Sequence, residues 1–358
     1  MPERSAGAAP AGETYAGSGV SIEAGDLAVS RIRHHVRSTA RPEVIGDIGG
    51  FGGLFALDRD RYRQPVLVAS TDGVGTKAMV AQATGRLTTI GIDLVAMCVD
   101  DLVCQGAEPL LFLDYISVGA LDPDQVEQLV EGMAAGCRLA GAALLGGEMA
   151  EHPGAMEAGE FDLVGFALGV VERDRVITGE HLAAGDALLG IPSPGLRSNG
   201  FSLARRVLLE RAGLTLDGPA WDGADRSLAD ELLEPSVIYA PAVVSLLDAV
   251  DVRAVAHITG GGISGNLARV LPDELDALVH RGTWEVPRIF GEIERLGDVE
   301  PDEMARVFNL GLGMVVAVPR RDVSAALDHL RSAGHRAVEV GEVAAGSGQV
   351  VLASGAPA

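Results

Sequence analysis

Aromatic residues and cysteines are scarce in this chain. Phe, Trp and Tyr make up 4% of its 358 residues, whereas hydrophobic residues as a whole make up 47%, so its cores must be built mainly from Ala, Val, Leu and Ile. The three cysteines are an odd number and form no C-x-x-C pair. They provide no disulfide framework and fit a reducing compartment, so we expect a cytoplasmic protein. Cys98 and Cys104 lie in an apolar stretch, where small core residues are expected rather than nucleophiles.

Positive charge and long apolar runs are lacking too. Lys and Arg number 28 against 50 Asp and Glu, and the net charge of −22 argues against nonspecific binding to nucleic acid or to an anionic membrane. No apolar stretch approaches the length that spans a bilayer. Residues 1–14 lack the apolar core of a secretory signal, and we expect them to form a disordered leader. We therefore expect no nucleic acid and no membrane among the partners.

Glycine, in contrast, is abundant, with 47 residues, which suits tight turns and close backbone approaches. The chain is also long enough for two domains. Apolar runs and turn signals predict strands at 66–70, 110–117, 163–171, 254–258, 314–318 and near 350, and helices at 92–103, 123–140, 202–212, 241–249 and 323–333. We predict an α/β fold (α+β layered) with two domains, 15–175 and 176–358, each a mixed sheet packed with helices.

A glycine-rich turn follows the first predicted strand. The run is VLVASTDGVGTK, which contains Asp72, Gly73, Gly75, Thr76 and Lys77. Glycines let backbone N–H groups approach phosphate oxygens, while Asp can hold Mg²⁺ and Lys can neutralise phosphate charge. The spacing is not that of a Walker A loop. Taken alone, the pattern also fits an ordinary connection between a strand and a helix.

Acidic residues interrupt the predicted helix 92–103, which is apolar on nearly every side and should be buried. Asp93 and Asp100 lie two turns apart and share a face, with Asp101 beside them. Buried carboxylates need hydrogen bonds, a cationic partner or a metal. We expect Asp93 to cap the start of the helix, and Asp100 and Asp101 to serve metal or phosphate chemistry.

Two further acids lie outside that helix. Asp114 is an acid within the apolar run of a predicted strand, and Glu148 lies in GGEMAE, which we expect to be a flexible loop. Glu148 could serve a metal or simply face water.

The second half offers polar residues beside glycines. Residues 256–262 read AHITGGG, and three glycines after a strand can approach an anion at a helix N-terminus or form a tight turn without a ligand. His257 is either a partly buried histidine or a residue that binds substrate or transfers a proton. Ser198, Asn199 and Asn309 offer neutral hydrogen bonds, although Ser and Asn beside Gly also form turns.

Several long runs occur in a fixed order along the chain. They are YAGSGVSIEAGD, RPEVIGDIGGFGGLFAL, TDGVGTK, GIDLVAMCVDDLVCQGAEPL, FLDYISVG, GGEMAEHPG, SNGFSLAR, AHITGGGISGNLARVLP and FNLGLGM. In sequence and order they resemble those of the phosphoribosylformylglycinamidine cyclo-ligases, the aminoimidazole ribonucleotide synthetases of purine biosynthesis. The resemblance extends from about residue 15 to about residue 351, which is nearly the whole chain.

This resemblance implies a ligase that forms a C–N bond. It would use ATP and Mg²⁺ to close formylglycinamidine ribonucleotide into 5-aminoimidazole ribonucleotide, releasing ADP and phosphate. It also implies a homodimer, with nucleotide near the subunit contact and residues 46–53 as a mobile lid. The implied site comprises catalytic His257, Lys77 and Asp101; ATP- and phosphate-binding Gly49, Gly50, Gly52, Asp72, Gly73, Gly75, Thr76 and Lys77; substrate-binding Ser198, Asn199, Thr259, Gly260, Gly261 and Asn309; and metal ligands Asp72, Asp101 and Asp100.

Four positions depart from the family pattern. Arg33 stands where a lysine is frequent, Asp100 where Asn is frequent, Arg197 where His is frequent and Gly265 where Glu is frequent. Because of the departures at Arg197 and Gly265, the identity of the residue that transfers a proton stays open.

Two other functions stay open at this point. One is a sister ATP-using enzyme of the same fold; among these, a selenophosphate synthetase would need a reactive Cys near the amino terminus, and none precedes Cys98. The other is a non-catalytic binding protein, which would be expected to have lost the acids of its site loops. Asp72, Asp101 and Lys77 are all present.

Overall fold

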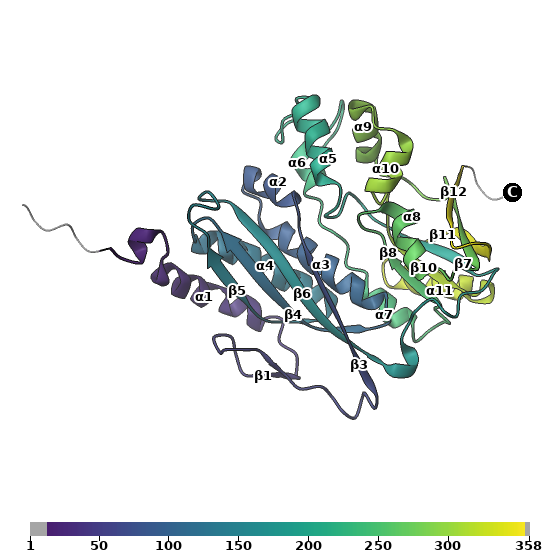
Figure 1. Ribbon diagram of the computed structural model, residues 1–358, viewed down its shortest axis with the longest axis horizontal. Helices are drawn as coiled ribbons and strands as arrows, with labels where there is room; N and C mark the ends of the chain where they lie inside the picture. Colours follow the sequence, from purple (N-terminus) through teal and green to yellow (C-terminus); the bar gives the residue numbers. More distant parts are fainter. Residues whose placement is uncertain (1–12, 355–358) are drawn as a thin grey trace, which may run out of the picture.

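The chain folds into two mixed sheets packed with helices, with a small antiparallel pair of strands, β1 and β2, beside them, which confirms the predicted class (Figure 1). This computed structural model describes residues 13–354, so residues 1–12 of the expected leader lie outside the described part. The first half contains α1 (Ile22–Arg37), β1 (Val44–Ile45), β2 (Leu54–Phe55), β3 (Pro65–Gly73), α2 (Lys77–Thr84), α3 (Thr88–Val103), β4 (Glu108–Val118), α4 (Pro123–Ala140), β5 (Ala143–Glu151) and β6 (Phe161–Glu172). The second half contains β7 (Ala187–Pro192), α5 (Phe201–Arg205), α6 (Leu228–Leu232), α7 (Ala240–Leu246), β8 (Ala254–His257), α8 (Gly262–Leu267), β9 (Leu275–Arg281), α9 (Arg288–Gly297), α10 (Pro301–Val307), β10 (Leu312–Val318), α11 (Val323–Ser332), β11 (Val338–Ala345) and β12 (Val350–Ser354).

The first sheet has the strand order β3-β6-β4-β5, in which only β4 and β5 run parallel. Helices α3 and α4 lie behind it in Figure 1 and pack on each other. A Cβ atom on Gly132 would lie 1.9 Å from the carbonyl oxygen of Thr88, and one on Gly91 would lie 2.4 Å from the backbone nitrogen of Met133. The two helices therefore touch backbone to backbone, which requires glycine at both positions.

The other face of this sheet is largely uncovered. Its outward side chains include Leu67, Tyr115, Val164 and Phe166, which are exposed. Phe166 is paired with Leu113, and Val164 with Tyr115, so these side chains are neighbours on one surface. We call this surface the open sheet face.

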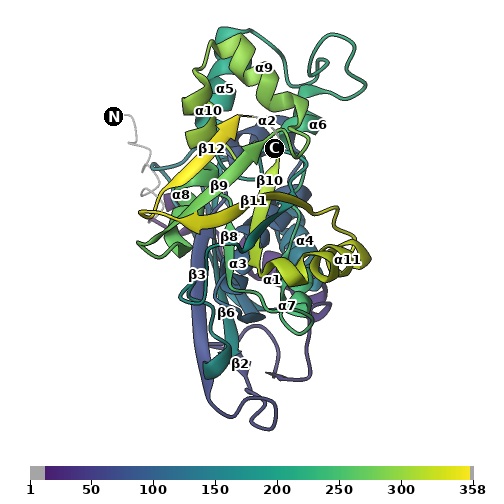
Figure 2. The ribbon, with the colours of Figure 1, turned by 90° about the vertical axis from the view of Figure 1, so that its right-hand side faces the viewer.

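The second sheet has the order β12-β9-β11-β7-β10-β8, with β12 and β9 parallel and the other pairs antiparallel. Figure 2 shows α8 and α11 on opposite sides of it. Leu188 and Val315 belong to a small core that includes residues of α8. Leu189 and Val316 point to the other face and join the large core that also contains the interior of the first half. The two halves therefore share one continuous core.

The structure corrects several predictions in detail. GGEMAE is the end of strand β5, paired with β4, and not a flexible loop. Helix α3 begins at Thr88, so Asp93 lies within it and does not cap it. The helix predicted at 202–212 is α5 followed by a wider π-helical stretch from Arg206 to Arg211. The predicted division near residue 175 stays a prediction; the first sheet ends at Glu172 and the second begins at Ala187. Across residues 13–354, no helix has both the length and the apolar character that crossing a bilayer requires.

Candidate active site

Three loops meet where the two halves face each other. One follows β3, one precedes α5 and one follows β8. The hydroxyl of Thr76 lies 3.0 Å from that of Ser202. A Cβ atom on Gly75 would lie 4.0 Å from the carbonyl oxygen of Ser198, and one on Gly260 would lie 3.7 Å from the amide nitrogen of Asn199. The loops predicted to bind phosphate and substrate are therefore neighbours, and we call this place the interdomain site.

Two carboxylates, Asp72 and Asp101, lie beside these loops. Asp101 accepts hydrogen bonds from His257 Nδ1 at 2.8 Å and from the Ser70 hydroxyl at 3.1 Å, and 45% of its side chain is exposed. Burial is the largest single influence on Asp101 and opposes its ionisation, but the hydrogen bonds from His257 and Ser70 and the nearby positive charges together outweigh it and lower the pKa of this carboxyl. Burial raises the pKa of Asp72, and the nearby charge of Asp101 adds to the rise.

The donor set of these two acids fits a divalent metal ion. Hard oxygen ligands are what Mg²⁺ prefers, and a cation between two like charges would relieve their repulsion. Asp72 also accepts a hydrogen bond from the backbone N–H of Gly73 at 2.7 Å, which fixes the carboxylate at the start of the loop.

His257 is placed differently from the prediction that it lines the mouth of a substrate loop. Its side chain is 2% exposed, and both ring nitrogens are engaged. Nδ1 faces Asp101, and Nε2 lies 3.0 Å from a nitrogen of the Arg197 guanidinium. Both ring nitrogens therefore contact other side chains in this arrangement, and the predicted catalytic role of His257 stays a prediction.

Asp100 is not placed as a metal ligand either. It is fully buried and forms an ion pair with Arg197 at 2.8 Å. Its other oxygen accepts hydrogen bonds from the backbone N–H groups of Tyr239 at 2.8 Å and Ala240 at 3.1 Å. The carboxylate is thereby satisfied by protein groups, and its predicted role as a metal ligand stays a prediction.

Lys77 is likewise enclosed and does not face a ligand-binding surface. Its ammonium group lies 2.6 Å from Asp93 and donates to the carbonyl oxygen of Glu234 at 2.9 Å. Asp93 in turn accepts from the backbone N–H and the hydroxyl of Ser236. The structure therefore places Lys77 in a buried ion pair, and its predicted catalytic and phosphate contacts stay a prediction.

One stretch of the second half, residues 234–240, contacts all four of these buried charges: Lys77, Asp93, Asp100 and Arg197. We call this stretch the docking segment. Lys77 donates to the carbonyl of Glu234, and Arg197 donates to that of Val237 at 2.8 Å. A buried ion pair is stable only when most of its remaining donors and acceptors are satisfied, and the backbone of this segment supplies partners for both pairs, although the buried Nε of Arg197 has none. The two acids of α3 thus hold the halves together.

The predicted substrate residues fall into two groups. Among residues 13–354, the Ser198 hydroxyl and the side-chain amide oxygen (Oδ1) of Asn199 are buried atoms without a hydrogen-bond partner, which leaves both available for a further polar group. Thr259 contacts the side chain of Asn266 at 3.2 Å, and Gly260 and Gly261 are exposed. Asn309 is different, because it donates to the carbonyl of Gly195 and accepts from the N–H of Gly311. These two hydrogen bonds close its own loop, and its predicted substrate contact stays a prediction.

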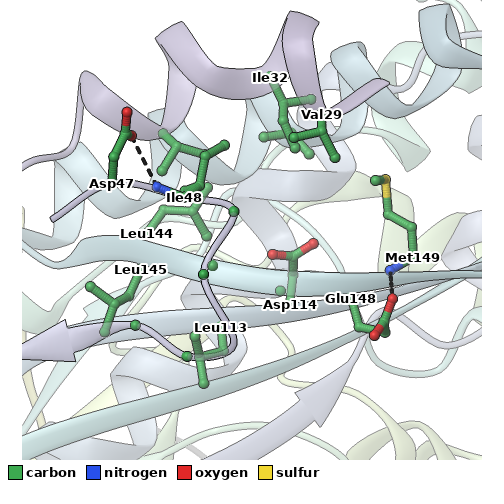
Figure 3. Close-up of a pocket in the computed structure, with 18 of the residues that line it drawn as sticks. Val29, Ile32, Asp47, Ile48, Leu113, Asp114, Leu144, Leu145, Glu148 and Met149 are labelled. Atoms are coloured by element: carbon green, nitrogen blue, oxygen red, sulfur yellow. Dashed lines mark hydrogen bonds between the residues drawn. The ribbon is translucent and has the colours of Figure 1, made fainter. Parts of the chain in front are cut away.

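A separate cavity of about 470 Å³ lies under the glycine-rich segment 46–53 (Figure 3). Gly49, Gly50 and Gly52 line it, together with α1, β4 and β5. Arg33 of α1 donates to Asp47 at 3.0 Å and to the carbonyl of Ile48 at 3.4 Å, at the base of the glycine-rich segment. The cavity is thus covered by a chain segment with few side chains of its own.

The sequence pointed to Asp114 as an acid in an apolar strand but gave it no role at this cavity. Figure 3 shows the carboxyl group of Asp114 pointing into it, with Glu148 nearby. Burial raises the pKa of Asp114 to about 7. A Cβ atom on Gly147 would lie 2.2 Å from the Asp114 carboxyl, so only glycine leaves room for this acid. An acid within an apolar strand was the available signal.

The cavity and the interdomain site lie along one row of the first sheet. Asp72 pairs with Gly165, and Gly165 pairs with Asp114. The two acids are therefore separated by two strand spacings, about 10 Å.

Comparisons with known proteins agree with this architecture. The profile of the domain described as "AIR synthase related protein, N-terminal domain" matches residues 60–171, and that of the "AIR synthase related protein, C-terminal domain" matches residues 183–353. The fold is shared with the crystal structures of thiamine-monophosphate kinase from Stenotrophomonas maltophilia K279a (18% identity, TM-score 0.67, covering 92% of this chain and 97% of that one) and of E. coli HypE (21% identity, TM-score 0.64, covering 92% and 93%). The protein therefore falls into the AIR-synthase-related class.

Sequence relatives narrow this class. The phosphoribosylformylglycinamidine cyclo-ligase of Myxococcus xanthus (strain DK1622) is 55% identical over 94% of this chain and 98% of its own length. That of Anaeromyxobacter dehalogenans (strain 2CP-1) is 55% identical over 93% of this chain and 96% of its own length. The chain belongs to the phosphoribosylformylglycinamidine cyclo-ligase family, which confirms the resemblance seen in its motifs.

Proposed function

We propose that this protein closes formylglycinamidine ribonucleotide into 5-aminoimidazole ribonucleotide at the expense of ATP, as a ligase of purine biosynthesis. The observation that carries this proposal is the identity of 55% over 94% of the chain with a cyclo-ligase. The convergence of the β3, α5 and β8 loops beside two carboxylates supports it, since ring closure requires phosphate, metal and ribonucleotide to meet.

The reaction has two steps that the site must serve. ATP transfers its γ-phosphoryl group to the formyl amide oxygen, which turns that oxygen into a good leaving group. The amidine nitrogen then attacks the same carbon, and phosphate departs. Mg²⁺, when bound, would neutralise the charge that develops on the phosphate oxygens. Asp72 and Asp101 are the residues that would hold the ion.

The remaining residues bind and orient. The loop after β3 presents backbone N–H groups, and the positive φ of 53° at Gly75 is favourable for glycine. Ser198 and Asn199, with their unpartnered oxygens, would bind polar groups of the ribonucleotide, together with Gly260 and Gly261. Because His257 is engaged on both sides, the proton acceptor for the amidine is sought among other groups as well, water included.

We place ATP partly in the cavity under the glycine-rich segment, with its phosphates directed toward the interdomain site. Asp114 and Asp72 lie in one row of the sheet, but the buried Phe112 and Cys98 fill the space over Gly165 between them, so a nucleotide joining the two places would have to pass around this row. A solved structure of this fold is the hydrogenase maturation protein HypE in complex with ATP, at 20% identity and a TM-score of 0.61. Asp114 and Glu148 are acidic, so a nucleotide there would need Mg²⁺ to offset the repulsion.

Two coarser proposals accompany this function. We propose a homodimer formed through the open sheet face, supported by the exposed Leu67, Tyr115, Val164 and Phe166. We also propose that the protein acts in the cytoplasm, supported by three cysteines that are all unpaired.

The test is product formation by the purified protein. With ATP, Mg²⁺ and formylglycinamidine ribonucleotide, we expect equal amounts of ADP and aminoimidazole ribonucleotide, the latter measured through diazo coupling of its aromatic amine. With ATP and Mg²⁺ alone, ADP release should be close to the blank. ADP release without formation of the amine would contradict the proposal.

A further inference from the structure

Two neighbouring histidines in the last turn of α1 lie beside a glutamate of α4, and none of the three takes part in the proposed reaction. His34 and His35 belong to α1, and Glu127 belongs to α4, which packs on α1. One ligand atom from each side chain lies within 4.8 Å of the other two. We propose that these three residues bind one divalent transition-metal ion, with Zn²⁺ as the representative case, and that the ion links α1 to α4.

The ligand types suit an ion of this kind. Imidazole nitrogens and a carboxylate oxygen are ligands of Zn²⁺, and imidazole also suits Co²⁺ and Ni²⁺, whereas Mg²⁺ is bound through oxygen. Three protein ligands leave one tetrahedral position for water. The site therefore differs in chemistry from the carboxylates Asp72 and Asp101, for which Mg²⁺ is proposed.

The backbone of α1 orients the ring of His34. Its Nδ1 lies 2.8 Å from the carbonyl oxygen of Arg31, one turn earlier in the helix. This contact occupies Nδ1 and leaves Nε2 as the ring nitrogen that is open to a metal ion. Histidines that bind metals commonly use their other ring nitrogen for a contact to a backbone carbonyl or a carboxylate.

The carboxylate of Glu127 divides its two oxygens between two neighbours. Oε1 lies 4.0 Å from His35 Nε2, and Oε2 lies 3.6 Å from the guanidinium of Arg31, which also pairs with Asp124. A separation of 4.0 Å is too long for a hydrogen bond. An ion with bonds of about 2 Å to each atom can bridge it after a small side-chain shift. The oxygen that faces His35 is therefore the one that would bind the ion.

Both ligand elements are partly accessible, which gives the ion a path from solvent. The side chains of His35 and Glu127 are 15% and 34% exposed, and His34 is exposed. An ordinary contact between His35 and Glu127 would not involve His34, yet the centres of the two imidazole rings lie 3.8 Å apart. The placement of both rings beside one carboxylate favours a shared ligand.

A link between α1 and α4 would also restrain the cavity. Val29 and Ile32 of α1 line its wall, and Arg33 of the same helix contacts Asp47 at the base of the glycine-rich segment. Because the two histidines lie next to Arg33 in the chain, an ion that holds them would restrict the helix on which this segment rests.

The first experiment titrates the unmodified protein with Zn²⁺ by calorimetry and with Co²⁺ by absorption, in excess Mg²⁺. We expect one site that is lost, or weakened at least about 10-fold, in His34→Gln, His35→Gln and Glu127→Gln, because loss of a direct ligand should cost no less than loss of an outer contact. The matched control, Glu180→Gln/His181→Gln, removes another His–Glu contact, at 3.7 Å, and should keep the site.

The three variants separate the parts of the proposal. Zn²⁺ affinity in both His34→Gln and His35→Gln equal to that of the unmodified protein would overturn the site, because the binding would then belong to other groups. Unchanged affinity in Glu127→Gln would overturn the link between the helices. His34 is exposed, so its replacement should leave the fold intact.

The second experiment measures hydrogen exchange with and without Zn²⁺. Exchange in α1 and α4 should slow in the unmodified protein and stay unchanged in His34→Gln, because the ion would hold the two helices together. Exchange in the unmodified protein that Zn²⁺ does not alter would contradict the link. Neither experiment uses ATP or ribonucleotide, so both results are independent of the proposed function.

Discussion

The ammonium nitrogen of Lys77 lies 2.6 Å from Asp93 Oδ2, and neither side chain has exposed surface. A buried charge that loses its partner is strongly destabilising, whereas removing both charges is often neutral or stabilising. We therefore predict that Lys77→Met lowers the free energy of unfolding by about 3–5 kcal/mol. Lys77→Met/Asp93→Asn should recover part of this loss.

Urea unfolding of the three proteins measures these differences. The double variant Lys77→Met/Asp93→Asn also tests whether Lys77 binds phosphate. If the double variant has the KM for ATP of the unmodified protein, Lys77 does not bind phosphate; a KM that stays strongly raised would restore the phosphate role suggested by the sequence.

Asp101→Asn should remove most of the activity and leave the fold intact. The substitution keeps the shape and loses the charge that would hold Mg²⁺, so we expect kcat to fall at least about 100-fold, as when one electrostatic group of an active site is lost. Asp328→Asn, on an exposed acid of α11, is the matched control. Near-normal turnover at limiting Mg²⁺ would remove Asp101 from the metal site.

Asp114 should make stability depend on pH. Its pKa is raised from 3.8 to about 7 in the folded protein, so the folded state binds more protons than the unfolded state between these values. The contribution of Asp114 is therefore fully present below about pH 4 and is lost as the pH rises to 7. For an isolated shift of this size the loss is on the order of 4 kcal/mol.

The asparagine in Asp114→Asn cannot ionise, so this variant should not lose stability through position 114 as the pH rises. We expect the variant to gain stability relative to the unmodified protein between pH 4 and pH 8, measured by urea unfolding at each pH. A difference between the two proteins that does not change with pH would show that Asp114 titrates normally.

Residues 46–53 should close over bound nucleotide. Hydrogen exchange in this segment should slow when a non-hydrolysable ATP analogue and Mg²⁺ are added, because the backbone over the cavity becomes ordered. Arg33→Met, which removes the contacts to Asp47 and Ile48, should weaken the protection. Exchange that is unchanged by the analogue would count against the lid.

The open sheet face should form the subunit contact. Light scattering should give the mass of a dimer for the unmodified protein and of a monomer for Phe166→Glu, since a buried carboxylate at that contact is unfavourable. Leu139→Glu, at an exposed position of α4, is the control and should remain dimeric. A monomeric unmodified protein would refute the proposed dimer.

The sequence predicted well those helices and strands whose limits are set by residues within the element itself. The helix predicted at 123–140 matches α4, which begins after Asp122 and ends at Gly141 in a left-handed conformation. Strand β5 was missed because its glycines and acids give no alternation, and its existence depends on pairing with β4. The loops around Asp72, Ser198 and Gly260 were found, because glycine beside polar residues is visible in a single run.

The roles of the buried charges could not be found in this way. Asp100 and Arg197 are 97 positions apart, and Asp93 and Ser236 are 143 apart, so the partner that satisfies each acid is set by the tertiary fold. The two departures at positions 100 and 197 prove to be partners in one ion pair. When the ion pair is not known, a metal site explains the presence of an acid in a buried helix equally well.

The docking segment also determines whether the first half of one family member can assemble with the second half of another. Except for the Ser236 hydroxyl and the buried Tyr239 ring, on which the Arg197 guanidinium packs, the acids and cations that hold this segment contact backbone groups: the N–H groups of Ser236, Tyr239 and Ala240 and the carbonyls of Glu234 and Val237. Backbone groups are the same whatever the side chains, so the side chains of this segment other than Tyr239 and Ser236 can be exchanged more freely than the charges that hold it. A chimera that joins the first half of one relative to the second half of another should therefore assemble when Lys77, Asp93, Asp100 and Arg197 are kept as two matched pairs.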